Sequence, residues 1–62
     1  MNIKSILVES AGNIAVGDNR WNIGIVEKIE QINEFTYAVY VSGAVAAHYN
    51  SSYVVEVIFE NE

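Results

Sequence analysis

The sequence predicts an all-β domain, a small antiparallel barrel or sandwich of five short strands. Its runs of β-branched and aromatic residues favour strands, and they alternate with short clusters of glycine, asparagine and serine that favour turns. The 62 residues contain no proline and no repeat, so nothing divides the chain. Residues 1–62 are therefore predicted to form one domain, with residues 59–62 as a frayed tail.

The strand candidates are separated by recognisable turn residues. In chain order they are residues 3–9, 23–32, 35–41, 44–49 and 54–59. A short apolar segment, 14–16, lies between the first two, flanked by a turn cluster at 10–13 and by Gly17-Asp18-Asn19. Alternation in 23–32 is imperfect, which predicts a bend or bulge near Gly24. Asn33-Glu34 is predicted to be the next turn.

The segment FTYAVYV at 35–41 is the clearest strand, because almost every residue favours β-structure. Ser42-Gly43 is a typical two-residue hairpin turn, so 44–49 is predicted to return antiparallel. The three alanines of 44–48 are also compatible with a short helix, and Gly43 favours the hairpin over it. The predicted pairs are Val41–Ala44, Tyr40–Val45, Val39–Ala46, Ala38–Ala47 and Tyr37–His48.

The order of these segments resembles an SH3-like barrel. Val16-Gly17-Asp18, followed by a glycine and a valine at 24–26, is similar to the start of many bacterial and ribosomal members. Asn50-Ser51-Ser52-Tyr53-Val54 is similar to the single helical turn and last strand that close eukaryotic SH3 domains. The resemblance implies that Tyr53 lines a proline-peptide groove. The chain departs from the family pattern in lacking a tandem tryptophan and an A-L-Y-D-Y-like segment, which puts proline-peptide binding in doubt.

Composition disfavours several function classes. The chain carries eight carboxylates against three cationic side chains, a formal net charge of −5. Nucleic-acid binders cluster lysine and arginine against phosphates, so a nucleic-acid partner is not expected. No apolar run approaches the length of a membrane span, and the N-terminus is a poor signal peptide. These features predict a soluble, cytoplasmic protein with no membrane partner.

Catalysis and cofactor binding are not expected either. His48 is the only histidine and no cysteine is present, so a transition-metal site lacks ligands. No serine lies in a nucleophile motif, and no glycine-rich phosphate loop occurs. Glu56, Glu60 and Glu62 lack the spacing of a calcium loop. The sequence therefore predicts a protein that is not an enzyme and that has no metal or cofactor.

The predicted hairpin offers one candidate binding surface. Its pairing places Tyr40, Val45 and Tyr49 on one uncharged face, where a two-layer domain would usually be polar. Tyrosine and tryptophan are enriched at interfaces, so Trp21, in a loop, is predicted to extend this surface, and Tyr53 to contribute to binding. The alternative is ordinary core, with Trp21 capping it.

These observations predict a small acidic protein-interaction module, an inhibitor or accessory factor, whose size would suit a phage or another mobile element. Its partner would be another protein bound through the tyrosine face. The first alternative is a self-assembling structural homo-oligomer, such as a homodimer, that uses the same face. The second is a nucleic-acid-binding SH3-like barrel, which the acidic charge disfavours.

Overall fold

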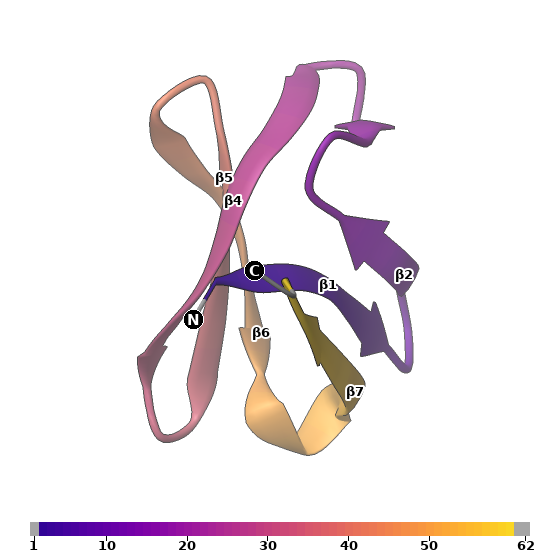
Figure 1. Cartoon of the computed structure of the whole chain (residues 1–62), viewed down its shortest axis with the longest axis vertical. Helices are drawn as coiled ribbons and strands as arrows, with labels where there is room; N and C mark the ends of the chain where they lie inside the picture. The colour runs from indigo at the N-terminus through magenta and orange to yellow at the C-terminus, as the bar shows by residue number, and fades with distance from the viewer. Residues whose placement is uncertain (1, 61–62) are drawn as a thin grey trace.

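The computed structural model describes residues 2–60 and is all-β, apart from one 3-10 turn. Figure 1 shows the elements in order. They are β1 (Ile3–Val8), β2 (Gly12–Ala15), β3 (Asn19–Arg20), β4 (Gly24–Asn33), β5 (Thr36–Val41), β6 (Ala44–Asn50), the 3-10 turn η1 (Ser51–Tyr53) and β7 (Val54–Phe59). The predicted all-β class and the predicted helical turn before the last strand are confirmed. Within the described residues, no helix is long and apolar enough to cross a membrane.

The strands form two antiparallel sheets rather than one set of five. The three-stranded sheet has the order β2-β1-β7, and the four-stranded sheet has the order β3-β4-β5-β6. The long β4 and its partners curl over β1 and β7 (Figure 1). Two short strands, β2 and β3, lie in the segment that was predicted to hold mainly turns. Phe35, predicted to begin a strand, lies in the β4–β5 turn and is exposed.

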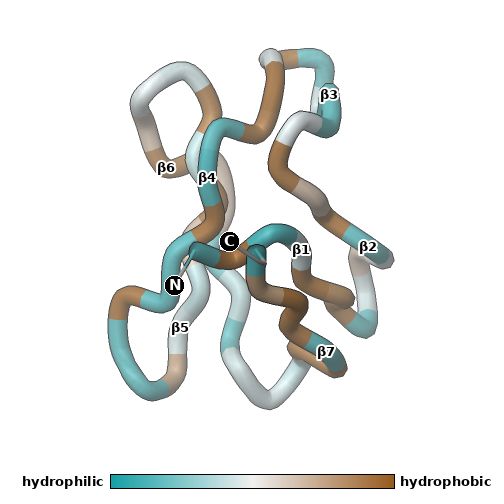
Figure 2. The backbone as a smooth tube through the Cα atoms, in the orientation of Figure 1, coloured by the Kyte–Doolittle hydropathy of each residue, from teal (hydrophilic) through white to brown (hydrophobic). Residues whose placement is uncertain are grey.

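The hydrophobic core lies between the two sheets. It consists of aliphatic side chains from four strands: Ile3, Ile6, Val8, Ile14, Val26, Ile29, Val39 and Val41. Strand alternation explains this choice on β5, where Val39 and Val41 point inward and Tyr40 points outward. Brown apolar segments of β1 and β4 meet in this region (Figure 2).

Part of the predicted tail, residues 59–62, is paired with β1 rather than frayed. Phe59 pairs with Ile3, and the Glu60 backbone N–H donates to the Asn2 carbonyl at 2.7 Å. These bonds attach residues 59 and 60 to the three-stranded sheet. The rest of the predicted tail, residues 61–62, lies outside the described residues.

The tight turn between β5 and β6 requires a left-handed backbone. In the β5–β6 hairpin, Ser42 and Gly43 have φ values of 54° and 79°, the positive pair of a type I′ turn. The predicted two-residue turn and the predicted return strand over 44–49 are thereby confirmed, and the helical alternative for 44–48 is wrong. The Gly43 N–H donates to Glu27 Oε1 at 2.8 Å, which ties the hairpin to β4.

Candidate functional site

The predicted hairpin register holds only next to the turn. Val41 pairs with Ala44 and Tyr40 with Val45, as predicted, but a bulge then adds one residue to β6. Beyond it Val39 pairs with Ala47, so the predicted pairing with Ala46 is wrong, as are the remaining pairs toward the open end of the hairpin. An extra residue in one strand exchanges the faces of all residues that follow it.

This exchange separates the tyrosines that were predicted to share a face. Tyr49 pairs with Tyr37, and both pack against the hydrophobic core. Tyr40 and Val45 stay on the outer face of the four-stranded sheet. His48, which the predicted register paired with Tyr37, pairs instead with Ala38 on this outer face and is exposed. The predicted tyrosine face is therefore wrong as a continuous surface, because one of its two tyrosines belongs to the core.

The outer face around Tyr40 also carries charged side chains from β4. The predicted surface missed them because it was built from the pairing of β5 with β6 alone. The Tyr40 hydroxyl donates to Glu30 Oε1 at 3.0 Å, and Lys28 Nζ lies 4.6 Å from the centroid of the Tyr40 ring. Both charged groups reach Tyr40 because β4 pairs Lys28 with Tyr40 and Glu30 with Ala38. A cation over the ring and an acceptor for the hydroxyl satisfy Tyr40 within the chain.

The contact with Glu30 changes the acidity of Tyr40. Its pKa is raised above the ordinary 10.0, first because the hydroxyl donates to Glu30, then through desolvation, and then because the Glu30 charge repels a phenolate. Tyr40 therefore remains a protonated donor throughout the neutral range. Its hydroxyl already has an acceptor, so it is a poorer anchor for a partner than a free tyrosine would be.

Trp21 lies elsewhere, at the tip of the turn between β3 and β4. Trp21 and Asn22 have φ values of 56° and 57°, and the Ile23 N–H donates to the Arg20 carbonyl at 3.2 Å, which makes a type I′ turn. A bulky side chain rarely adopts this left-handed conformation, and an L-residue pays about 1–2 kcal/mol for it. The turn thus holds a tryptophan where asparagine or glycine is the usual residue.

Arg20 fixes one side of this turn. Its guanidinium donates from Nη1 to the Asn13 carbonyl at 3.1 Å and from Nη2 to the Ala11 carbonyl at 3.3 Å, and it lies 5.3 Å from the Trp21 ring centroid. The Nε atom is buried and has no partner among the described residues. Arg20 therefore joins the β3–β4 turn to β2 and supports one face of the tryptophan.

The turn carries further exposed apolar side chains. Trp21 is 40% exposed, and Ile23 and Ile25 on the same short segment are 56% and 49% exposed. We call Trp21, Ile23 and Ile25 the tryptophan turn. Sequence reasoning singled out only Trp21. The signal available for the other two was their position, since both are apolar residues that flank Gly24 directly after a turn. Clustered exposed apolar residues of this kind mark contact sites.

Tyr53 is exposed on η1 and does not join this cluster. Asn50 caps η1, since its Oδ1 accepts from the Ser52 N–H at 2.9 Å, and the Tyr53 carbonyl accepts from the Glu9 N–H at 2.8 Å. The η1 turn and the β3–β4 turn lie toward opposite ends of the molecule (Figure 1). The five predicted binding residues thus fall in different places: Trp21 at one end, Tyr40 and Val45 on the outer face, Tyr49 against the core and Tyr53 at the other end.

Chemistry-bearing side chains do not converge anywhere in residues 2–60 to form a metal site, because no three His, Cys, Asp or Glu residues lie together. No known protein family, curated protein or solved structure matches the chain. Its function is therefore inferred from its own residues.

Proposed function

We propose that this chain is a small, non-catalytic protein-interaction module, an inhibitor or accessory factor, whose partner docks on the tryptophan turn. The observation that carries the proposal is Trp21, held exposed in a left-handed turn that disfavours it. Strained conformations persist where surrounding structure enforces them, and they concentrate at functional sites. A tryptophan in this left-handed turn lowers the stability of the domain, and a role of Trp21 in binding would explain why it is kept there.

The partner chemistry follows from the shape and charge of the site. Trp21 and Ile23 project from a tight turn, which suits insertion into an apolar pocket, and tryptophan is among the residues that dominate binding energy. The net charge of −5 favours a partner whose pocket has a basic rim. Arg20 stays cationic beside Trp21, but its Nη atoms already donate to two backbone carbonyls, which leaves it few donors for a carboxylate of the partner.

As part of the same proposal, the protein is soluble and cytoplasmic, and its fold is an SH3-like barrel of five principal strands: β1, β4, β5, β6 and β7. The order of these strands and the η1 turn before the last one support it. The short β2 and β3 then lie within the long connection between the first two principal strands. The small size suits a protein of a phage or another mobile element, where short accessory factors are economical.

Trp21→Asn tests the docking surface. Asparagine tolerates the left-handed turn, so relief of strain offsets the lost tryptophan packing, and the free energy of unfolding should change by less than about 1 kcal/mol. Binding should nevertheless fall about a hundredfold, because the anchor is gone. The measurements are urea unfolding and recovery of the partner from source-cell lysate, followed by calorimetry with the purified partner.

Ile32→Asn is the matched control, because Ile32 is also an exposed apolar residue of this chain but lies at the far end of β4. It should bind like the wild type. Equal binding by the wild type and Trp21→Asn would contradict the proposal. A loss of several kcal/mol of stability in Trp21→Asn would instead identify Trp21 as a cap of the core.

Self-assembly is the second candidate, and β7 favours it. β7 is an edge strand, and its Val55, Ile58 and Phe59 are exposed. Two copies of β7 can pair antiparallel about a two-fold axis with Val57 opposite Val57 and Val55 opposite Phe59, a register that keeps Glu56 from facing Glu56. Exposed apolar edges with this self-complementarity promote strand pairing between chains.

Ile58→Lys tests that pairing against Ile32→Lys, since both isoleucines are 45% exposed. Light scattering of the wild type should show a dimer at tens of micromolar protein, on the order of concentrations at which weak interfaces form. Ile58→Lys should be a monomer, because lysine blocks an edge, and Ile32→Lys should remain a dimer. A monomeric wild type would remove this candidate and leave the docking proposal untouched.

A further inference from the structure

β4 has an edge that is largely open. One edge pairs with β5 along the strand, whereas the other pairs with β3 only at Gly24 and Ile25. At Val26 this edge is still bonded: the Val26 N–H donates to the Asp18 carbonyl at 2.8 Å, and the Val26 carbonyl accepts from the Gly17 N–H at 2.9 Å. From residue 27 to residue 33, no strand in the described part of the chain pairs with this edge. An antiparallel strand turns every second N–H and C=O to each side, so this edge presents free donors and acceptors.

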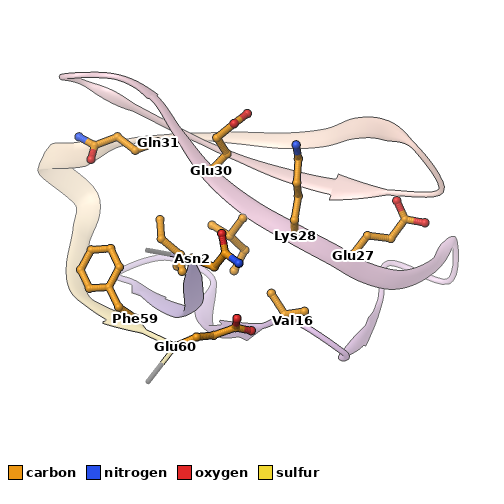
Figure 3. Close-up of a pocket in the computed structure, with 10 residues that line it drawn as sticks. Asn2, Val16, Glu27, Lys28, Glu30, Gln31, Phe59 and Glu60 are labelled. Carbon is orange, nitrogen blue, oxygen red and sulfur yellow. The ribbon is translucent and has the colours of Figure 1, made fainter. Parts of the chain in front are cut away.

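A cavity of 440 Å³ adjoins this open edge. It lies between β4 on one side and the start of β1 and the end of β7 on the other (Figure 3). Its apolar lining comes from Ile3, Val16, Ile29 and Phe59. The volume is within the range of about 300–1,000 Å³ that is typical of ligand pockets. An unpaired strand edge thus borders a partly apolar space that can receive side chains.

The charged groups around the cavity are mostly acidic. Glu27, Glu30 and Glu60 line it, and Lys28 is the single cation. In Figure 3, Glu60 lies across the cavity from β4, whereas Lys28 and Glu30 extend to the far side of β4. Lys28 is also engaged over the Tyr40 ring. Lys28 and Glu30 are therefore both directed away from the cavity, and the charges that remain beside it are the carboxylates of Glu27 and Glu60.

We propose that the open edge of β4 binds an extended peptide segment in which apolar residues alternate with lysine or arginine. The segment adds to the four-stranded sheet as a further strand, with backbone bonds supplied by residues 27–33. Its apolar side chains enter the cavity toward Ile29 and Val16, and its cations lie near Glu27 and Glu60. This site is separate from the tryptophan turn and does not rest on it.

A synthetic peptide of alternating valine and lysine, as long as the 27–33 edge, is the probe. We expect saturable binding by calorimetry and slower amide hydrogen exchange within residues 27–33, because the added strand protects edge amides. The same peptide with alternate backbone N-methylation should bind at least about tenfold more weakly, since it lacks the bonds to β4. A valine–glutamate peptide should not bind, because its charges repel the carboxylates.

Glu60→Lys is the informative variant, and Glu9→Lys is its control. Both move the net charge equally, but Glu9 is exposed beyond the end of β1, away from the cavity lining. Glu60→Lys should weaken peptide binding about tenfold and Glu9→Lys less than about twofold. Trp21→Asn should bind the peptide normally. Absent binding, binding without protection of residues 27–33, or an equal loss in both lysine variants would overturn the proposal.

Discussion

Replacing Ile6 with alanine is expected to leave the domain largely unfolded at 25 °C. Ile6 is fully buried at the centre of β1, where it pairs with Ile14 of β2 and Val57 of β7. Truncating a buried isoleucine removes transfer free energy and leaves a cavity, at a cost of about 2–5 kcal/mol. A domain of this size has only about 3–5 kcal/mol of stability from its core. The two quantities are equal in size, so the folded population should collapse.

Ile32→Ala is the control for this result, because the same atoms are removed from a side chain that is 45% exposed. It should cost less than about 1 kcal/mol, since little buried area is lost. Urea unfolding followed by circular dichroism measures both variants. An Ile6→Ala protein as stable as the wild type would mean that the three-stranded sheet contributes little to the core.

The predictable part of the fold is set by local chemistry. The alternation of valine with tyrosine on β5, and the Ser42-Gly43 turn after it, predicted the hairpin and its first two pairs correctly. The turn residues Asn50-Ser51-Ser52 marked the segment that became η1, where the Asn50 Oδ1 accepts from the N–H and the hydroxyl of Ser52. Such features are visible in sequence since each depends on a few adjacent residues.

The β6 bulge was not predictable in the same way. Ala44 to Ala47 is a run of alanine and valine in which either face is equally apolar, so no pattern marks the extra residue. The consequence reaches Tyr49, which packs against the core instead of beside Tyr40. Where a strand has no clear apolar–polar pattern, tertiary contacts set its pairing register. A binding surface predicted from the wrong register then groups the wrong side chains.

The charged surroundings of Tyr40 and the cavity beside β4 depend on contacts between segments far apart in the chain. Glu30 and Tyr40 meet because β4 and β5 pair with a shift between Val26 and Lys28. The bend predicted near Gly24 thus occurs as two features, a positive φ at Gly24 itself and a register shift a few residues later. The shift left a local signal in the imperfect alternation of residues 23–32, whereas the space between β4 and Glu60 leaves none.

Gly24→Ala is the second substitution with a large expected effect. Gly24 has a φ of 140°, which L side chains rarely adopt, and an added Cβ would lie 3.1 Å from Val41 Cγ1 and 3.4 Å from Ser42 Oγ. Backbone strain of about 1–3 kcal/mol is therefore joined by a contact with a core side chain that can yield only by disturbing its neighbours. The midpoint of urea unfolding should fall steeply.

Gly12→Ala separates these two causes. Gly12 also has a positive φ, of 80°, but an added Cβ would meet nothing within 4 Å. It should lose only the cost of the left-handed backbone, about 1–2 kcal/mol, and keep its core intact. A Gly24→Ala protein no less stable than Gly12→Ala would show that Val41 moves aside without cost. In that case the junction between the tryptophan turn and the β5–β6 hairpin is soft, and the left-handed Trp21 must be held chiefly by Arg20 and its bonds to Ala11 and Asn13.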